Sequence, residues 1–402
     1  MAGGVFRCGS GTPADPYMVE DLKDLEEIHN GFQTPGKYYY NKYFVLITNI
    51  DLDEEGETTL EEPLYYFHPI GNYGDSNITF EGGFDGNGHV IKNGRFKTGG
   101  FIGGNAGLFA SIGGGGLGEG DGCLIKNVFF DNVELYAYNS GVGYIAGAAL
   151  NATVRNCHVI NGNLTNTYTD NGRAGGLVGH SADALHLEEC SYRGSINGRI
   201  VGGLVGSMTN TEYLFGNFIT DCFARGDLTG YLVGGMVGSI TTAYHSIRYC
   251  YSACSFTAGA AWGSGHRLGG YGGIWHQNAS ITMLSLYYDN TYIGHAYYDA
   301  WSYVVGNGRI TEDMTYPHDT ETTYINFDFY LTWEKEEFWE NNAYPFIKRR
   351  YYPNLICSPG FNIWVNKSKK WKQITTVHCN KAKKMKGIGT IDVNKGKQWR
   401  PI

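Results

Sequence analysis

The sequence predicts an all-β protein whose body is a right-handed parallel β-helix, a rod of stacked coils. Glycine supplies 59 of the 402 residues, about twice its usual ~7% share, whereas charged residues make up 17% against an average of ~25%. The 31 tyrosines and 20 phenylalanines provide large side chains to bury, so the glycines do not belong to a disordered linker. Two short motifs also recur in step, at a period of about thirty residues.

Residues 1–30 predict a strand and a short helix that caps the rod. Leu22, Leu25 and Ile28 recur at helical spacing within 21–28, which is typical of an amphipathic helix. The open end of a β-helix exposes unpaired backbone groups. We therefore expect this helix to cover the N-terminal end.

Residues 31–350 predict the coils themselves. One motif reads Gly-Gly, a large apolar residue, Val and Gly, and begins at Gly175, Gly202 and Gly234, at offsets of 27 and 32 residues. Runs of alternating apolar and polar residues between the glycine pairs indicate strands, and the pairs indicate turns that need positive φ or close backbone approach. Two motifs locked to one period mean one coil per period.

The second motif carries a cysteine and follows the same period. It ends at Cys157, Cys190, Cys222 and Cys250, at offsets of 33, 32 and 28 residues. We expect these cysteines to form an inward ladder of small apolar groups, the alternative being a row of metal-binding thiolates. No Cys-x-x-Cys pair occurs among the nine cysteines, so we expect free thiols, no metal site and no cofactor.

These segments resemble the GLUG-repeat family of parallel β-helix proteins. The resemblance covers about residues 9–350 and implies the β-helix fold. Proteins of this kind are mostly surface, adhesive or virion parts, so it implies little about activity. The residues that carry it are G-S-G-T-P-A-D-P-Y at 9–17, the helix, 80–93, the glycine coils, and a closing stretch at 311–314, 324–328, Trp333 and 344–346.

The tail, residues 351–402, predicts a small domain of β-hairpins. Segments 363–374, 377–388 and 391–402 align without gaps at a step of fourteen residues, each with an Asn-Lys-x-Lys turn or its variant between two strands. This pattern resembles the C-terminal segments of bacteriophage tail and other virion proteins. Residues 361–402 hold eleven basic residues and one acid, a charge of +10, which leaves −8 − 10 = −18 on the rest.

The basic tail predicts docking on an acidic surface, such as other virion subunits or an anionic glycan. The alternative is a solvated charged face. Nucleic-acid binding would add aromatic stacking platforms or a known module, and we do not expect it. The candidate docking residues are Trp364, Lys369, Lys370, Trp371, Lys372 and Trp399.

A second candidate site is the aromatic stretch at 262–301, which interrupts the regular repeat. Aromatic rings on a rigid scaffold suit stacking on sugar rings. The alternative is that they fill the irregular end of the core. The candidate ligand-binding residues are Trp262, His266, Tyr271, Trp275, His276, Tyr287, Tyr288 and Trp301.

Carboxylate pairs would be needed if the protein cleaved polysaccharides, since glycoside hydrolysis uses one acid and one base or nucleophile. None of the pairs stands out, and we assign no catalytic residue. The pairs considered are Asp131 with Glu134, Glu188 with Glu189, Asp221 with Asp227, and Asp289 with Asp299.

Together these features predict a bacteriophage virion protein of the tail-fibre, tailspike or receptor-binding kind, which attaches to a host surface glycan or to other virion subunits. By analogy with other virion rods we expect a trimer. No secretory signal and no apolar run of ~20 residues is visible, so we expect it in the virion and not in a membrane. The alternatives are a tailspike-type polysaccharide depolymerase and a purely structural head or tail component.

Overall fold

The computed structural model divides the chain into two compact units, 1–352 and 353–402. Each is described by itself. The residues that the structure describes are 6–32, 34–52, 68–71, 79–97, 104–114, 122–209, 216–241, 244–259, 267–275, 281–292, 307–317, 322–334, 344–347, 363–367, 370–374, 392–394 and 399–401.

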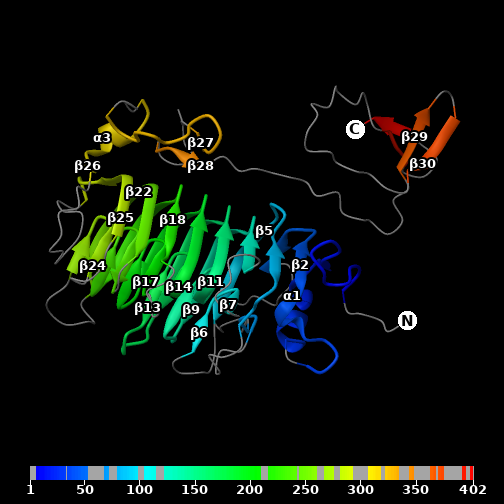
Figure 1. The fold of residues 1–402 in the computed structure, drawn as a ribbon, viewed down its shortest axis with the longest axis horizontal. Coiled ribbons are helices and arrows are strands. Elements are labelled where there is room, and N and C mark those ends of the chain that lie inside the picture. The colour runs from blue at the N-terminus through cyan, green and yellow to red at the C-terminus, as the bar shows by residue number, and fades with distance from the viewer. Residues whose placement is uncertain are drawn as a thin grey trace. The chain divides into compact units, whose positions relative to one another are not determined.

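The first unit is an all-β solenoid of parallel strands (Figure 1), as the sequence predicts. Successive coils add strands to four rows, and each strand pairs with its equivalent one coil away. The first row contains β7 (Phe109–Gly113), β11 (Ala146–Arg155), β14 (Val178–Glu188), β17 (Val205–Met208), β21 (Val237–Ile240) and β24 (Gly272–Trp275).

The second row contains β1 (Tyr17–Val19), β2 (Tyr43–Leu46), β4 (Gly83–Asp85), β8 (Cys123–Lys126), the later halves of β11 and β14, β18 (Phe218–Thr220), β22 (His245–Ala258) and β25 (Ile281–Asp289). The third contains β3 (Ile50–Asp51), β5 (Val90–Lys97), β9 (Phe129–Ala137), β12 (His158–Asn166), β15 (Ser191–Asn197), β19 (Phe223–Gly230), the later parts of β22 and β25, and β26 (Asn307–Arg309). The fourth is a separate sheet of β6 (Asn105–Ala106), β10 (Gly141–Gly143), β13 (Arg173–Gly175), β16 (Ile200–Gly202), β20 (Leu232–Gly234) and β23 (Arg267–Gly269).

A helix, α1 (Leu22–Asn30), lies where the sequence predicts one. The side chain of Asp21 accepts a hydrogen bond from the Asp24 backbone N at 2.9 Å, which begins the helix. Leu22, Leu25 and Ile28 are buried in the same apolar core as the coils. The short 3-10 turn Tyr39–Asn41 follows before β2.

The glycine motif marks a close approach of two backbones. Gly202 ends β16, and a Cβ atom there would lie 1.9 Å from the Val205 carbonyl oxygen and 2.7 Å from the backbone N of Gly238. Gly175 and Gly234 meet equivalent atoms, and none of the three has a positive φ. Of the two reasons that the sequence offers for these glycines, close approach is the correct one.

The cysteine ladder lies in the core, as predicted. Cys157, Cys190, Cys222 and Cys250 are fully buried. The Sγ of each of the last three accepts from the backbone N of the preceding cysteine at 3.4 Å, and the Cys190 thiol donates to the Glu188 carbonyl at 3.0 Å. The ladder thus supplies hydrogen bonds to a bent backbone as well as apolar bulk.

Burial also keeps two of these thiols, Cys157 and Cys222, in the protonated form. It raises the pKa of the Cys157 and Cys222 thiols well above the ordinary value, because no solvent stabilises a thiolate there. The seven described cysteines are free, and the described residues contain no cluster of His, Cys, Asp or Glu that could hold a metal ion.

We expect the ladder thiols to resist a thiol reagent in the folded protein, because a reagent in solution cannot reach the fully buried sulfur atoms. In a variant with Cys8, Cys357 and Cys379 changed to serine, an anionic aromatic disulfide should release almost no chromophore until urea unfolds the chain. Stoichiometric labelling under native conditions would contradict the buried ladder.

The residue before each ladder cysteine has a left-handed backbone. This φ is 50° at Asn156, 51° at Glu189, 52° at Asp221 and 53° at Tyr249, and Asn127, at the equivalent position before Val128, has a φ of 56°. Asparagine and aspartate tolerate this region, whereas other side chains are strained by ~1–2 kcal/mol. The left-handed backbone therefore explains why three of these five residues are Asn or Asp.

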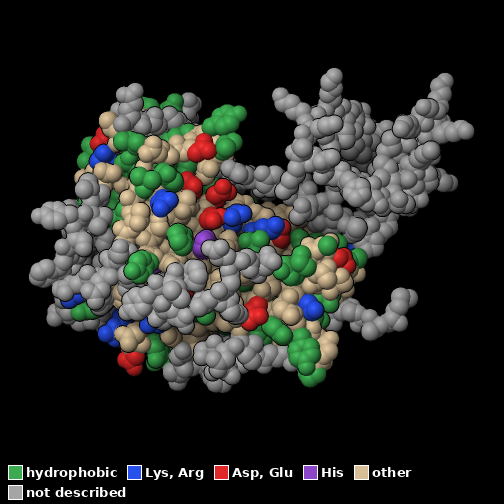
Figure 2. Space-filling view, viewed as in Figure 1, with side chains coloured by type: hydrophobic (Ala, Val, Ile, Leu, Met, Phe, Trp, Pro, Cys, Tyr) green, Lys and Arg blue, Asp and Glu red, His purple; other side chains and the backbone are tan. Residues whose placement is uncertain are grey.

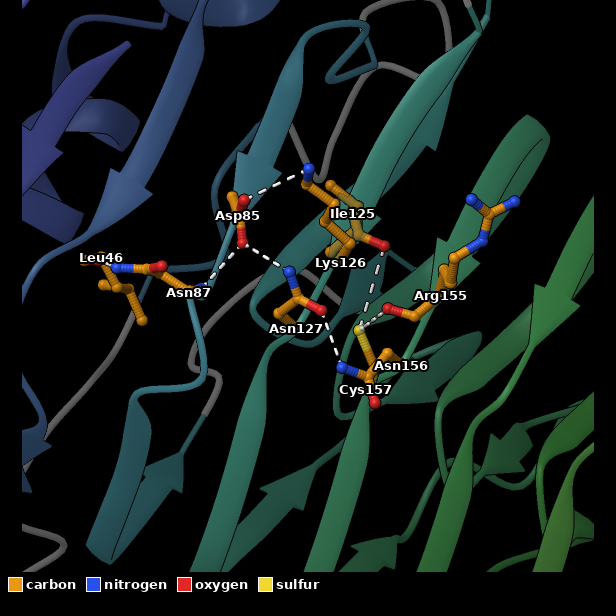
Figure 3. A network of polar contacts seen from close by, with 9 residues as sticks. All are labelled: Leu46, Asp85, Asn87, Ile125, Lys126, Asn127, Arg155, Asn156 and Cys157. Carbon is orange, nitrogen blue, oxygen red and sulfur yellow. Dashed lines mark hydrogen bonds and ion pairs between the residues drawn. The ribbon is translucent and has the colours of Figure 1, made fainter. Parts of the chain in front are cut away.

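Figure 3 shows that the asparagines at this turn also bond to one another. Asn156 Nδ2 donates to Asn127 Oδ1 at 2.7 Å, and Asn127 Nδ2 donates to Asp85 Oδ1 at 2.9 Å. Asp85 Oδ1 also accepts from the backbone N of Asn87 at 2.8 Å, and Lys126 Nζ lies 3.3 Å from Asp85 Oδ2. Side-chain hydrogen bonds therefore tie three successive coils together.

Glu189 breaks the asparagine pattern, so Glu189→Asn is expected to stabilise the protein by about 1 kcal/mol. The new side chain relieves left-handed strain at φ 51° without changing the buried core. Chemical denaturation at neutral pH would measure the gain. The reciprocal Asn156→Glu should destabilise by more, because it also removes the bond to Asn127, and equal stabilities for Glu189→Asn and the parent would refute the strain argument.

After the last coil, the described residues 310–317, 322–334 and 344–347 fold back over the outer face of the third row; we call them the closing segment. It contains α3 (Thr311–Met314), β27 (Trp333–Glu334) and β28 (Phe346–Ile347), the last two antiparallel. Its aromatic side chains bury the outward rings of β19, β22 and β25. The cluster comprises Phe223, Tyr251, Ala253, Tyr287, Met314, Tyr324, Phe327, Trp333, Tyr344 and Ile347.

The second unit contains antiparallel pairs at the first and third of the fourteen-residue repeats. β29 (Ile363–Lys367) pairs with β30 (Lys370–Ile374), and β31 (Asp392–Asn394) pairs with β32 (Trp399–Pro401). Asn366 faces Trp371 in one pair and Asn394 faces Trp399 in the other, the same two positions of the repeat. The middle repeat, 377–388, lies outside the described residues.

Candidate binding surface

The prediction that the aromatic stretch at 262–301 binds a ligand is wrong for the three residues whose side chains the structure describes. Tyr271, Tyr287 and Tyr288 are only 1, 1 and 6% exposed. Tyr271 and Tyr288 pack edge to face in the core at 5.2 Å, and Tyr287 lies under the closing segment. Tyr271 and Tyr288 thus fill the end of the core, which is the alternative weighed above. Trp275 lies on β24, but its side chain is not described, and Trp262, His266, His276 and Trp301 lie outside the described residues.

The docking residues of the tail lie on the hairpins. Trp364 is on β29, Trp399 is on β32, and Lys370, Trp371 and Lys372 are on β30, whereas Lys369 is outside the described residues. Lys370 pairs with Lys367 and Lys372 with Val365, so alternate positions of β30 are basic. What they bind stays a prediction.

The carboxylates considered for glycan cleavage have structural partners. Glu134 forms a two-bond ion pair with Arg95, and Glu188 forms one with Arg155. Asp131 accepts from Asn161 Nδ2 at 3.0 Å, and Asp227 accepts from the Ser255 hydroxyl. Asp289 is 2% exposed and accepts from the hydroxyls of Thr311 at 2.7 Å and Tyr344 at 2.5 Å. Asp299 is outside the described residues.

Asp221 differs from the other carboxylates in its protonation. Burial raises its pKa to about 6, and neighbouring acids, with Glu189 first, act in the same direction, although the Trp333 indole N–H donates to Asp221 Oδ1 at 2.9 Å. An acid with a raised pKa can be catalytic. Here its partner is a core tryptophan, so we interpret Asp221 as the anchor of the closing segment.

A serine, a histidine and an asparagine are also linked by hydrogen bonds. His158 Nδ1 lies 2.8 Å from Ser191 Oγ, and His158 Nε2 lies 2.9 Å from Asn156 Oδ1. Because Asn156 Nδ2 already donates to Asn127, its Oδ1 faces the ring and leaves Nδ1 to accept from the serine hydroxyl. This is the order of nucleophile, base and orienting group. All three residues are only 4% exposed, so no substrate reaches Ser191, and the set continues the asparagine ladder.

Elsewhere the third row presents a surface of polar side chains in register. We call it the polar face: two lines of outward residues on β9, β12, β15, β19 and β22, with inward Leu135, Leu164, Ile196 and Leu228 in the core beneath them. One line is Glu134, Asn163, Ser195, Asp227 and Ser255, and the other is Tyr136, Thr165, Asn197, Thr229 and Thr257.

Three tyrosines stand at one end of the polar face. Tyr136 and Tyr138 are 38 and 43% exposed, and the Tyr138 and Tyr168 rings meet edge to face at 5.2 Å. Asn166, which is 1% exposed, fixes the two turns that carry Tyr138 and Tyr168. Its Oδ1 accepts from the backbone N of Asn139 and of Tyr168, each at 3.2 Å. The rings are thus exposed on a fixed backbone.

The sequence contained a signal for this cluster that the aromatic count at 262–301 obscured. In the alternating run 133–138, Val133 and Leu135 fall on the inward positions and Tyr136 on an outward one. Large rings at the outward positions of a strand are the feature to look for.

A different face is charged. Figure 2 shows basic and acidic side chains next to one another across the middle of the face in view. The ion pairs Lys126–Asp85 and Arg155–Glu188 join successive coils. Because opposite charges neutralise each other there, this face offers no large patch of one sign.

Comparison with known proteins supports the fold and leaves the activity open. No family model matches the chain. It is 32% identical over 171 residues to halomucin of Haloquadratum walsbyi, a match that covers 42% of this chain but 2% of halomucin. The crystal structure of a candidate immunoglobulin A1 protease from Bacteroides ovatus superposes with a TM-score of 0.61 at 20% identity, over 87% of this chain and 97% of that one. Within the described residues no helix is long and apolar enough to cross a membrane.

Proposed function

We propose that this chain is a rigid attachment module that binds a surface polymer through the polar face. The observation that carries the proposal is the register of ten outward side chains on five parallel strands, backed by a continuous apolar core. Such a surface is preorganised, so binding costs little ordering of the protein. The ion-paired carboxylates and the buried Ser191 favour binding over catalysis.

The finer features of the fold belong to the same proposal. We assign the right-handed sense to the coils because parallel crossovers almost always have it, and we place the chain with the GLUG-repeat proteins on the residues given above. We assign to α1 the role of an end cap, since its three apolar residues continue the core. Such a cap would protect one end of the rod that presents the polar face.

We further propose a bacteriophage particle as the setting, with trimers of this chain acting in host attachment. The support is the basic fourteen-residue repeat of the tail. A polysaccharide depolymerase and a purely structural virion part are the alternatives, and neither comparison bears on the choice.

Adsorption of the purified, labelled full chain to a panel of bacterial cells and isolated wall polysaccharides tests the attachment function. Saturable binding without release of reducing ends is the expected result. Binding accompanied by new reducing ends would favour the depolymerase, and no adsorption to any surface would favour the purely structural part.

Removal of residues 361–402 tests the setting separately. The polar face is remote in sequence from this segment, so we expect the truncated chain to adsorb as before and to be lost from assembled particles. Truncated chains that still enter particles at normal levels would overturn a docking role for the tail.

A further inference from the structure

We propose that the polar face binds a neutral, linear glycan laid along the rod axis, with about one sugar ring for each coil and a ring stacked on the Tyr136–Tyr138–Tyr168 cluster. This inference rests on the proposed attachment function and adds the ligand class and the way it binds.

The spacing of the polar face favours a linear polymer of repeating units. Parallel strands lie ~4.8 Å apart, so the five strands present equivalent groups over roughly 19 Å. A pyranose ring and its linkage extend over nearly the same length as one such step. Each ring of a linear chain would therefore meet the same kind of side chain as the ring before it.

The chemistry of the two lines suits sugar hydroxyls. Thr165, Thr229 and Thr257 offer hydroxyl groups that donate and accept, and the amides of Asn163 and Asn197 do both as well. Ser195 Oγ already donates to Asn163 Oδ1 at 3.2 Å, which orients that amide. These are the groups that hydrogen-bond a hydroxyl-rich chain without a charge.

The charges on and beside the polar face favour a neutral ligand. Glu134 is held by Arg95 at 2.5 Å, and Asp227 is an exposed carboxylate that accepts from Ser255. The nearest other basic groups on these strands are Arg193 and Arg225, which pair with each other two residues before Ser195 and Asp227, and Arg225 lies over the Tyr344 ring of the closing segment. Because the acid is exposed and both arginines are half-buried, the polar face presents no exposed basic patch to attract an anionic polymer.

The tyrosines supply the apolar part of the contact. Rings that are 38 and 43% exposed present a face to solvent, and sugar rings pack their C–H faces on such surfaces. Because Asn166 fixes the two turns, stacking requires little ordering of the backbone. The cluster would hold one end of the glycan and the polar lines would set its direction.

Titration calorimetry of the full chain with neutral β-linked glucose, mannose and N-acetylglucosamine oligosaccharides, one to eight residues long, tests the inference. We expect affinity for one series to rise with each added residue up to about five and then level off. Tyr136→Ala/Tyr138→Ala should weaken binding about ten-fold, and Asn197→Glu should abolish the gain from chain length. The matched control is Phe218→Ala, which removes a 39% exposed ring on another row and should change nothing.

Three outcomes would overturn the inference and leave the attachment function standing: equal affinity for one and five residues, binding that ignores the tyrosine variant, or adsorption to cells with no affinity for any neutral oligosaccharide. In the last case a preference for acidic oligosaccharides would identify a charged ligand instead. If the chain neither adsorbs to cells nor binds any oligosaccharide, the proposed function itself fails.

Discussion

Gly202→Ala is expected to destabilise the solenoid severely. The added methyl group would lie 1.9 Å from the Val205 carbonyl oxygen and 2.7 Å from the Gly238 backbone N. Both obstacles are backbone atoms, so no side-chain rotation can make room. Relief would require the separation of β16 from the start of β17 or from the next coil, with loss of their hydrogen bonds.

The cost should exceed that of ordinary overpacking, which is ~1–3 kcal/mol. We expect a loss of at least about 4 kcal/mol, a large part of the ~5–15 kcal/mol that stabilises a folded domain. Circular dichroism during thermal unfolding, together with the soluble yield, would measure it. Gly206→Ala should behave alike, because its methyl would lie 2.5 Å from the Gly179 carbonyl oxygen.

Gly36→Ala is the matched control. Gly36 has a φ of +88°, but a Cβ atom there meets nothing within 4 Å. This variant should lose only the ~1–2 kcal/mol of left-handed strain. If Gly202→Ala cost no more than Gly36→Ala, close backbone approach would not be the reason for the glycine motif.

Much of the solenoid could be predicted from the sequence because each coil repeats the same local arrangement of strands and turns. The cysteine before an inward strand and the Asn or Asp in the left-handed turn are local requirements, so they recur at a readable period. The closing segment is different. Trp333 bonds to Asp221, 112 positions away, and such a partner has no signature in local spacing.

The same distinction explains why the candidate binding surface is not the one that the sequence predicts. Tyr287 lies on an outward position of its strand, and only the closing segment buries it. Tyr136 occupies a similar outward position on β9 and remains exposed. Local sequence indicates which side of a strand a ring takes, but the path of the chain decides whether another segment covers it.

His245→Asn is expected to change how stability depends on pH, by an amount comparable to the loss of a core side chain. His245 is 2% exposed, and its Nδ1 lies 3.3 Å from both the backbone N and the Nδ2 of Asn217. Asn217 cannot turn its amide, because its Oδ1 accepts from Ser181 Oγ at 2.5 Å and from the Leu185 backbone N at 3.0 Å. Two donors therefore face Nδ1, and a proton there has no acceptor.

Burial lowers the pKa of His245 from 6.5 to about 4. Between those values the unfolded chain binds a proton that the folded chain does not, so stability is present above pH 6.5 and falls as the pH drops toward 4. The shift corresponds to about 3 kcal/mol. His180, whose pKa burial also lowers to about 4, acts in the same direction.

Two carboxyl groups oppose this trend, so the parent protein alone cannot reveal it. Burial raises the pKa of Asp24 and of Asp221 from 3.8 to about 6. A raised pKa contributes stability that is present below 3.8 and lost as the pH rises through 6. The informative quantity is consequently the difference between the parent and a variant at each pH.

Urea unfolding at pH 7 and at pH 4 would measure the free energy of unfolding of His245→Asn and of the parent. Between these two pH values, we expect the free energy of unfolding of His245→Asn to fall by about 3 kcal/mol less than that of the parent. Asp221→Asn keeps a side chain that tolerates the left-handed backbone. Between pH 7 and pH 4, its free energy of unfolding should fall by about 2 kcal/mol more than that of the parent, and the effect is smaller than for His245 because Asp221 is partly exposed. Asp227→Asn, an exposed control, should parallel the parent. Parallel curves for His245→Asn and the parent would mean that the pKa of His245 is the same in the folded and unfolded chains, which the two donors of Asn217 argue against.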